Sequence, residues 1–161
     1  IDPDIVCLAK GIGGMGTPMA LNLVKPEYDK LWAPGEHTGT FRGQSLSFVA
    51  GTEAIKYFEN DTLMAEVKVK EKAMHAALEP LSKKANVQVR GKGMIIGLDL
   101  GDGAKAAEVV KQCFAKGLLI ASCGIGGRVV KLIPPLTIPD EDLKEGLDIL
   151  VTTATAVLEA A

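Results

Sequence analysis

Short apolar runs and longer amphipathic stretches alternate along this chain. Two apolar runs, at about residues 4–9 and 18–24, are bounded by Gly, Pro and Asp, and they predict strands of a buried sheet that is covered on both faces. Residues 30–43 mix Trp, Pro and Gly with polar residues and have no periodic apolar face, which predicts a loop. Residues 45–58 are predominantly apolar and predict a helix.

A long amphipathic helix is expected next, from about residue 62 to residue 85. Asn60 and Asp61 precede it as a break and as the N-cap. Lys70 and the other charged residues are expected on faces away from the apolar one, and Pro80 is expected to kink or end the helix near its last turn because it removes one hydrogen bond. The apolar positions at helical spacing are Leu63, Val67, Met74, Leu78 and Leu81.

The hydrophobic period changes after Asn86. The expected elements are strands at 87–90, 94–100, 118–122 and 128–133, and helices at 104–116 and 140–159. Acidic residues fill the first turn of the last helix, where the helix dipole favours negative charge. This mixture predicts a small α/β domain over residues 86–161.

Composition and charge narrow the class of protein. The chain has 161 residues, of which 47% are hydrophobic, and this is enough to bury a core. The formal net charge of −2 gives no basic surface for nucleic acid or anionic membranes. No apolar stretch approaches the roughly 18 residues of a membrane span, and no signal peptide precedes the first strand. A soluble, cytoplasmic protein is therefore expected.

The cysteines and histidines do not suggest a metal site. Cys7, Cys113 and Cys123 show no C-x-x-C spacing and predict reduced core thiols. The contexts of His37 and His75 do not suggest a metal-binding pair.

Lys10 is the most informative single residue. It ends the first apolar run and opens into the glycine-rich residues 11–16. An amine at the mouth of a buried strand is one that a protein can desolvate, lower in pKa and use as a Schiff-base nucleophile. The alternative is a strand-end lysine that simply reaches water.

Residues 11–16 also fit the dinucleotide pattern G-x-G-x-x-G. That fingerprint needs a helix to begin at its last glycine, but residues 17–24 predict a turn and another strand. A nicotinamide or flavin site is therefore disfavoured. The glycines are expected instead to clear room for a bulky cofactor.

A polar loop at residues 37–43 offers groups that suit a phosphate. Thr38 and Thr40 carry hydroxyls, Gly39 leaves its backbone unobstructed, and Arg42 adds a cation nearby. The same composition is typical of an ordinary turn, so both interpretations stay open.

Several segments resemble one enzyme family. "DPDIVCLAKGIGGMGTPMALNLVKPE" and "GEHTGTFRGQSLSFVAGTEAIKYFE" resemble the pyridoxal-phosphate lysine region and the phosphate-contact loop of class III (omega) aminotransferases. "VQVRGKGMIIGLDL" and "VVKLIPPLTIPDEDLKEGLDIL" are similar to the C-terminal domain of that family. Within the family, "HTGTFRG…FV" is most similar to the diaminobutyrate:2-oxoglutarate aminotransferases of ectoine synthesis.

The resemblance implies an α/β fold in two parts. Residues 1–85 would be the C-terminal part of the large, pyridoxal-phosphate-binding fold-type-I domain plus an interdomain helix, and residues 86–161 the small C-terminal domain. Because the chain begins without Met, it is expected to be a C-terminal fragment that is inactive alone. The parent enzyme would move the terminal amino group between 2,4-diaminobutyrate and 2-oxoglutarate or glutamate.

The resemblance also assigns site residues. Lys10 would be the covalent anchor of pyridoxal 5'-phosphate and its proton shuttle, while Gly39 and Thr40 would bind the phosphate, Thr40 across the interface of a homodimer. Lys131 stands where many members carry an arginine for a substrate carboxylate, and it is either that substrate-binding group or a solvent-facing strand lysine. Arg90 is expected to make a structural or substrate-facing contact.

Two other functions remain open at this point. One is another omega-aminotransferase, acting on ornithine, acetylornithine or 4-aminobutyrate. The other is a noncatalytic α/β assembly module, in which Lys10 is an exposed strand end.

Overall fold

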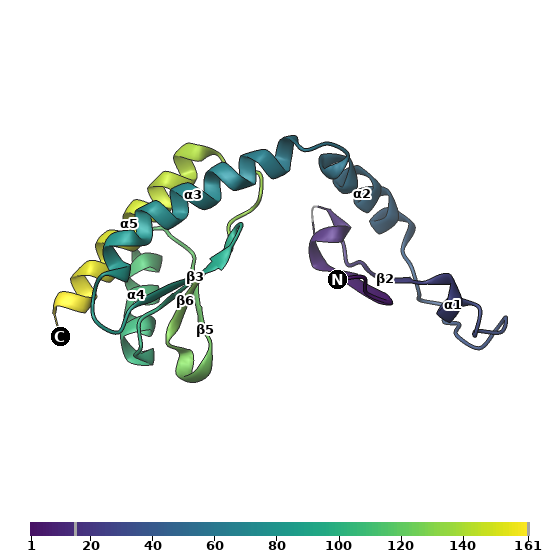
Figure 1. The fold of residues 1–161 in the computed structure, drawn as a ribbon, viewed down its shortest axis with the longest axis horizontal. Coiled ribbons are helices and arrows are strands. Elements are labelled where there is room, and N and C mark those ends of the chain that lie inside the picture. Colours follow the sequence, from purple (N-terminus) through teal and green to yellow (C-terminus); the bar gives the residue numbers. More distant parts are fainter. Residues whose placement is uncertain (15, 161) are drawn as a thin grey trace. The chain divides into compact units, whose positions relative to one another are not determined.

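The computed structural model describes residues 1–14 and 16–160 of the chain. The chain divides into two compact units, Ile1–Thr62 and Leu63–Ala161. Each unit contains both strands and helices, so the chain is α/β, as the sequence predicts (Figure 1).

The first unit begins with a β-hairpin. Strands β1 (Ile5–Ala9) and β2 (Ala20–Val24) pair antiparallel, and this confirms both predicted strands. No residue of either strand is buried among the described residues, so this chain alone does not supply the covering predicted for the sheet, and that covering stays a prediction. Cys7, expected as a core thiol, is accordingly exposed. A 3-10 helix that the apolar pattern does not predict, η1 (Lys10–Gly13), follows β1 directly.

Three further helical segments complete the first unit. The short helix α1 (Pro26–Asp29) was not predicted; a proline at its first position provides its start. The predicted helix at 45–58 is confirmed as α2 (Ser45–Ile55) followed by the 3-10 turn η2 (Lys56–Phe58). The expected loop contains no strand or regular helix between Leu31 and Gln44.

Helix α3 (Thr62–Ser82) provides one wall of the second unit, and all five predicted apolar positions are buried in its core. The Asn60 side chain, two residues before the helix, accepts a hydrogen bond from the Thr62 N–H at 2.9 Å. The helix ends two residues after Pro80. The placement of Lys70 on another face is wrong: the residue is 7% exposed, and its amine donates to the Leu136 carbonyl oxygen. Its aliphatic stem can continue the apolar stripe while its amine finds an acceptor.

A four-stranded antiparallel sheet forms the second layer of this unit, in the order β3-β4-β6-β5. Its strands are β3 (Gln88–Lys92), β4 (Ile95–Asp99), β5 (Ala121–Cys123) and β6 (Val129–Leu132). The strand predicted at 118–122 begins later than expected. The reason is that the Leu118 N–H donates to Cys113, at the end of the preceding helix, and is therefore not free to join the sheet.

Helices α4 (Gly103–Ala115) and α5 (Asp140–Glu159) complete the layer that α3 begins (Figure 1). Alternate residues of β4 and β6 enter a core shared with these helices: Ile96, Leu98, Val130 and Leu132. Gly97 and Lys131, which lie opposite each other in register, therefore point to the other face of the sheet. The turn η3 (Ile125–Gly127) joins β5 to β6.

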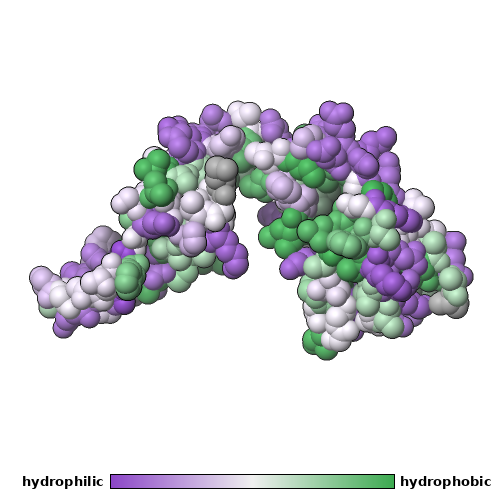
Figure 2. All heavy atoms as spheres, turned by 180° about the vertical axis from the view of Figure 1, so that it is seen from behind, coloured by the Kyte–Doolittle hydropathy of each residue, from purple (hydrophilic) through white to green (hydrophobic). Residues whose placement is uncertain are grey.

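Large apolar side chains remain exposed on each unit, and Figure 2 shows them as green patches among polar surface. In residues 1–14 and 16–160, no helix combines the length and apolar character needed to cross a bilayer. Along the sequence, the boundary between the two compact units follows Thr62, within the range that the sequence assigns to the large domain. The assignment of residues 1–85 to that domain and of 86–161 to a small domain stays a prediction.

Candidate functional site

Lys10 has an unusual backbone conformation. Its φ is 58°, and among the described non-glycine residues only Lys10 and Asn86 have a positive φ. Asparagine tolerates this region, whereas a lysine held there costs on the order of 1–3 kcal/mol. Such outliers concentrate at functional sites. The Lys10 side chain is exposed to solvent, so the described residues do not remove water from its amine as the sequence predicts.

Helix α2 holds the turn that carries Lys10. A Cβ added to Gly51, on α2, would lie 2.7 Å from the Ile12 carbonyl oxygen, so the helix and the turn touch through backbone. A Cβ on Gly14 would likewise lie 3.0 Å from the Ala50 carbonyl oxygen. The glycines at these two positions allow the close approach.

A buried hydroxyl links α2 to the segment that follows the Lys10 turn. Ser47 is 1% exposed, and its Oγ donates to the Pro18 carbonyl oxygen at 2.9 Å. Sequence reasoning did not identify Ser47 or Gly51. Their i, i+4 spacing in an otherwise apolar helix, which places two small residues on one face, is the signal that could have found them.

The glycine-rich stretch does not open an α-helix. Residues 17–19 form neither the predicted turn nor a helix, and the predicted strand is confirmed as β2. This stretch therefore lacks the helix N-terminus that a dinucleotide site requires.

The polar loop at residues 37–43 is exposed and ends beside α2. The Arg42 N–H donates to the Gly39 carbonyl oxygen at 3.1 Å, which closes a tight turn around Thr40. Thr40 borders a pocket of about 430 Å³ that Met19 and Ser47 also line. One pocket of the first unit therefore joins the predicted phosphate loop to the segment that follows the Lys10 turn.

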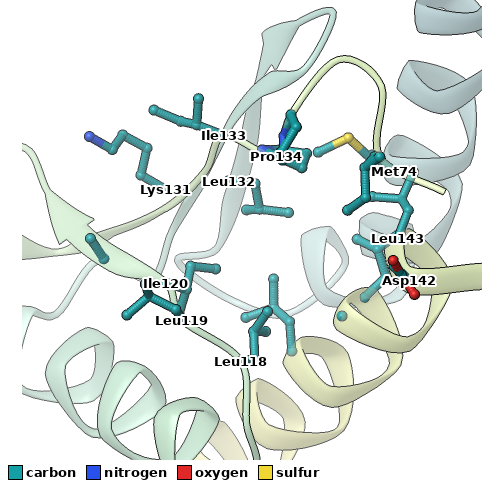
Figure 3. Close-up of a pocket in the computed structure, with 16 residues that line it drawn as sticks. Met74, Leu118, Leu119, Ile120, Lys131, Leu132, Ile133, Pro134, Asp142 and Leu143 are labelled. Carbon is teal, nitrogen blue, oxygen red and sulfur yellow. The ribbon is translucent and has the colours of Figure 1, made fainter. Parts of the chain in front are cut away.

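Lys131 lies on β6 in the second unit, opposite Gly97 of β4 and Ala121 of β5. It is half-buried, and it stands at the margin of an apolar pocket of about 540 Å³. Figure 3 shows Leu132 directed into this pocket and the amine of Lys131 directed away from it. Among the described residues no carboxylate forms an ion pair with Lys131.

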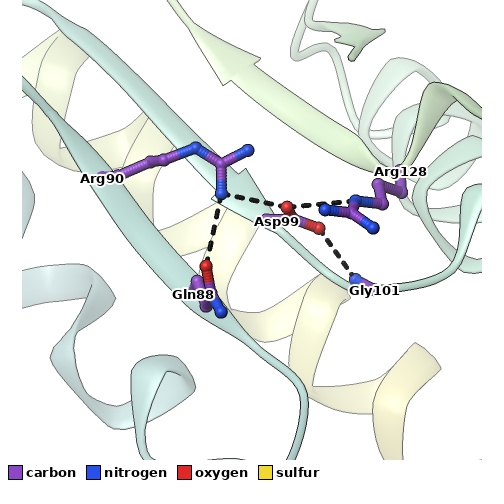
Figure 4. Close-up of polar contacts among 5 residues, drawn as sticks. All are labelled: Gln88, Arg90, Asp99, Gly101 and Arg128. Carbon is purple, nitrogen blue, oxygen red and sulfur yellow. Dashed lines mark hydrogen bonds and ion pairs between the residues drawn. The ribbon is translucent and has the colours of Figure 1, made fainter. Parts of the chain in front are cut away.

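Arg90 makes a structural contact with a buried carboxylate that the sequence did not single out. Asp99 is 3% exposed, and its Oδ2 lies 2.9 Å from Arg90 Nη1 and 3.2 Å from Arg128 Nε (Figure 4). Burial raises the pKa of Asp99, but the Gly101 N–H, the Arg90 hydrogen bond and the two guanidinium charges outweigh it, and the net pKa is lowered. The signal in the sequence was a lone carboxylate at the end of an apolar strand.

Comparison with known proteins identifies the family. The family model of aminotransferase class-III matches residues 1–154. The chain belongs to the class-III aminotransferases. This confirms the resemblance seen in the sequence, and enzymes of this family depend on pyridoxal phosphate.

Several curated relatives of this aminotransferase chain share one name. The diaminobutyrate–2-oxoglutarate transaminase of Oceanobacillus iheyensis is 40% identical over 99% of the chain and 38% of its own length. That of Wolinella succinogenes is 44% identical over 98% of the chain and 37% of its own length. The chain thus spans less than half the length of these relatives.

Solved structures show the same fold. The ornithine delta-aminotransferase of Plasmodium falciparum matches with a TM-score of 0.85 and 26% identity, over all of this chain and 42% of that one. An Arthrobacter phospholyase matches with a TM-score of 0.85 and 25% identity, over 97% of this chain and 39% of that one. These likenesses confirm the predicted fold class, an α/β chain that forms part of a fold-type-I aminotransferase.

Proposed function

We propose that the parent enzyme moves the terminal amino group between 2,4-diaminobutyrate and 2-oxoglutarate or glutamate, as a cytoplasmic homodimer serving ectoine synthesis. The observation that supports this most is the 40–44% identity, over nearly the whole chain, to enzymes named for that reaction. The chain spans only part of those enzymes, so residues 1–161 alone are expected to be inactive.

The residues of this chain fit pyridoxal 5'-phosphate. The aldehyde needs a primary amine, and Lys10 presents one from a turn whose backbone is held out of its preferred region. The phosphate needs several donors, and the loop at 37–43 provides two hydroxyls and an open backbone at Gly39. When bound, this cofactor supplies the electron sink for the bond that breaks at the substrate carbon.

Lys10 would have two roles. Its Nζ would hold the cofactor through the aldehyde group, and as a free amine it would serve as the general acid/base that moves a proton at the substrate carbon. Both roles require the amine to return to one position. The contact of Gly51 with the turn, and the hydrogen bond of Ser47 to the segment that follows it, support this by fixing the backbone on both sides of the turn.

Gly39 and Thr40 would bind the phosphate, with Thr40 acting on the cofactor of the partner subunit. The homodimer would then be part of the site, since each subunit supplies Lys10 to one centre and Thr40 to the other. The whole loop at 37–43 is exposed in this chain, as expected if Thr40 contacts the partner subunit.

Lys131 would hold a carboxylate of the amino donor or of the 2-oxo acid. It stands on the face of the sheet opposite the core, and its cross-strand neighbours Gly97 and Ala121 are small, which leaves space around its amine. A lysine binds a carboxylate as a compact point charge without the bidentate fork of arginine.

The test uses the full-length aminotransferase that contains this sequence. With 2-oxoglutarate as acceptor, 2,4-diaminobutyrate should give glutamate faster than ornithine does. Lys10→Ala should abolish the reaction, and Lys30→Ala, an exposed lysine of the same unit, should leave it intact. Faster turnover of ornithine would favour the second candidate, which the likeness to the Plasmodium ornithine aminotransferase supports. If neither donor supports amine transfer, the remaining interpretation is a noncatalytic assembly module.

A further inference from the structure

Arg42 lies directly over the backbone of the predicted phosphate loop. A Cβ added to Gly39 would fall 2.6 Å from Arg42 Nε and 3.0 Å from its Cδ and Cγ. The side chain of Arg42 therefore occupies the space that any larger residue at position 39 would need. Gly39 lies between Thr38 and Thr40 in the sequence, so the guanidinium group lies over the backbone that joins these two hydroxyl-bearing residues.

Two aromatic side chains hold the guanidinium group in this position. Arg42 Nη1 donates a hydrogen bond to Nε2 of His37. The ring of His37 in turn packs against Trp32, with 5.0 Å between ring centroids. The Arg42 backbone N–H is bonded to Gly39, so both the main chain and the side chain of Arg42 are fixed on the loop.

The charge of Arg42 is not neutralised within the described residues. Arg90 and Arg128 both pair with Asp99, whereas Arg42 forms no ion pair with any described carboxylate. Its hydrogen bond to His37 uses Nη1, and no described group accepts from Nε or Nη2. An arginine held in place with donors to spare suits an oxyanion of matching planar geometry.

We infer that Arg42 is a third anchor of the phosphate, beside Thr40 and the backbone at Gly39. The ligand is a phosphate monoester dianion, that of pyridoxal phosphate, so this inference rests on the proposed function. It gives Gly39 a second purpose, because a glycine there makes room for the guanidinium group as well as exposing the backbone. His37 and Trp32 are positioning residues, which act on the ligand only through Arg42.

The test follows the backbone and Arg Nε signals of the 15N-labelled full-length aminotransferase that contains this sequence, freed of cofactor, during titrations with inorganic phosphate, pyridoxal phosphate and pyridoxal. We expect the first two ligands to shift Thr38, Thr40 and the Arg42 Nε–H, and pyridoxal, which lacks phosphate, to leave them unchanged. Arg42→Gln should weaken phosphate binding by about tenfold or more, the scale of a charge-assisted hydrogen bond.

Two further variants separate the arginine from general charge. Gly39→Ala keeps the charge of Arg42 but displaces its guanidinium group, and it should weaken phosphate binding as Arg42→Gln does. Lys30→Gln removes an exposed positive charge outside the loop and should change affinity by less than about twofold. Unchanged binding by Arg42→Gln, an equal loss in Lys30→Gln, or no phosphate-induced shift in the loop would each overturn the inference.

Lys10→Ala distinguishes this inference from the proposed function. Its loop should respond to inorganic phosphate like the wild type, since Lys10 lies outside the loop. If Lys10 proves unreactive towards pyridoxal phosphate while Arg42 still binds phosphate, the proposed function fails and the anion site stands.

Discussion

Gly51→Ala tests whether α2 holds the Lys10 turn. The new methyl group would lie 2.7 Å from the Ile12 carbonyl oxygen and 2.9 Å from Met19 Sδ. The Met19 side chain can move, but the carbonyl belongs to the backbone of η1, so helix and turn must separate by several tenths of an ångström. Overpacking of this kind costs about 1–3 kcal/mol, and alanine regains about 0.5–1 kcal/mol as the better helix former. We expect a net loss of about 1 kcal/mol in local stability.

Gly146→Ala is the matched control on helix α5. Its Cβ would lie 3.4 Å from Leu118 Cδ1, an ordinary contact with the end of a flexible side chain. This variant should therefore stabilise its helix by about 0.5–1 kcal/mol. Amide hydrogen exchange reads each helix separately, with faster exchange expected in α2 of Gly51→Ala and slower exchange in α5 of Gly146→Ala. Slower exchange in α2 as well would refute the close contact between helix and turn.

The other expectations concern a buried charge, a helix cap and the phosphate loop. Because the pKa of Asp99 is lowered in the folded chain, the stability that its charge contributes is present above about pH 4 and is lost as the pH falls through the folded pKa. In urea melts at pH 7, Asp99→Asn should lower the free energy of unfolding by about 1.5–3 kcal/mol, and it should also reduce the loss of stability at acid pH. The exposed control Asp148→Asn should change neither quantity, and equal melts of the two variants would contradict this expectation. Asp102 caps α4 by accepting from the N–H groups of Ala104 and Lys105, so Asp102→Ala should lose about 1 kcal/mol in the same melts, and an unchanged midpoint would show that the cap contributes nothing. Thr40→Ala should weaken pyridoxal-phosphate binding by the full-length enzyme about tenfold and leave kcat at saturating cofactor nearly unchanged; a fall in kcat alone would place Thr40 outside the phosphate site.

Elements whose causes are local could be predicted from the sequence. Helix α5 spans Asp140–Glu159, as expected, because its apolar period and its acidic first turn both lie within the helix itself. The strand character of β1 and β2 also follows from short apolar runs. The covering of these strands does not, since it depends on chain segments outside these two runs.

Features that depend on tertiary packing were missed. Lys70 is buried because its helical position continues the apolar stripe and a distant carbonyl, that of Leu136, meets its amine. The Asp99 network joins residues that are far apart in the sequence, and no local sequence pattern indicates that Arg128 pairs with Asp99.

The candidate site divides in the same way. Lys10 was found because a lysine between an apolar run and a run of glycines is a local pattern. The position of the Arg42 side chain over Gly39 could not be predicted, because it depends on the rotamer of Arg42 and on its contact with the His37–Trp32 pair. The role of Lys131 likewise stays a prediction.

The identity of the lysine that holds the cofactor is the most direct test of the proposed function. The full-length aminotransferase is incubated with pyridoxal phosphate and reduced with borohydride, which fixes the pyridoxyl group on the amine that carries it, and the modified peptide is located by mass spectrometry. We expect one modified lysine per subunit, Lys10, and no site-specific modification in Lys10→Ala. A pyridoxyl group on Lys25 or Lys30 in place of Lys10, or an even spread over surface lysines, would contradict the assignment of Lys10 as the cofactor-binding residue.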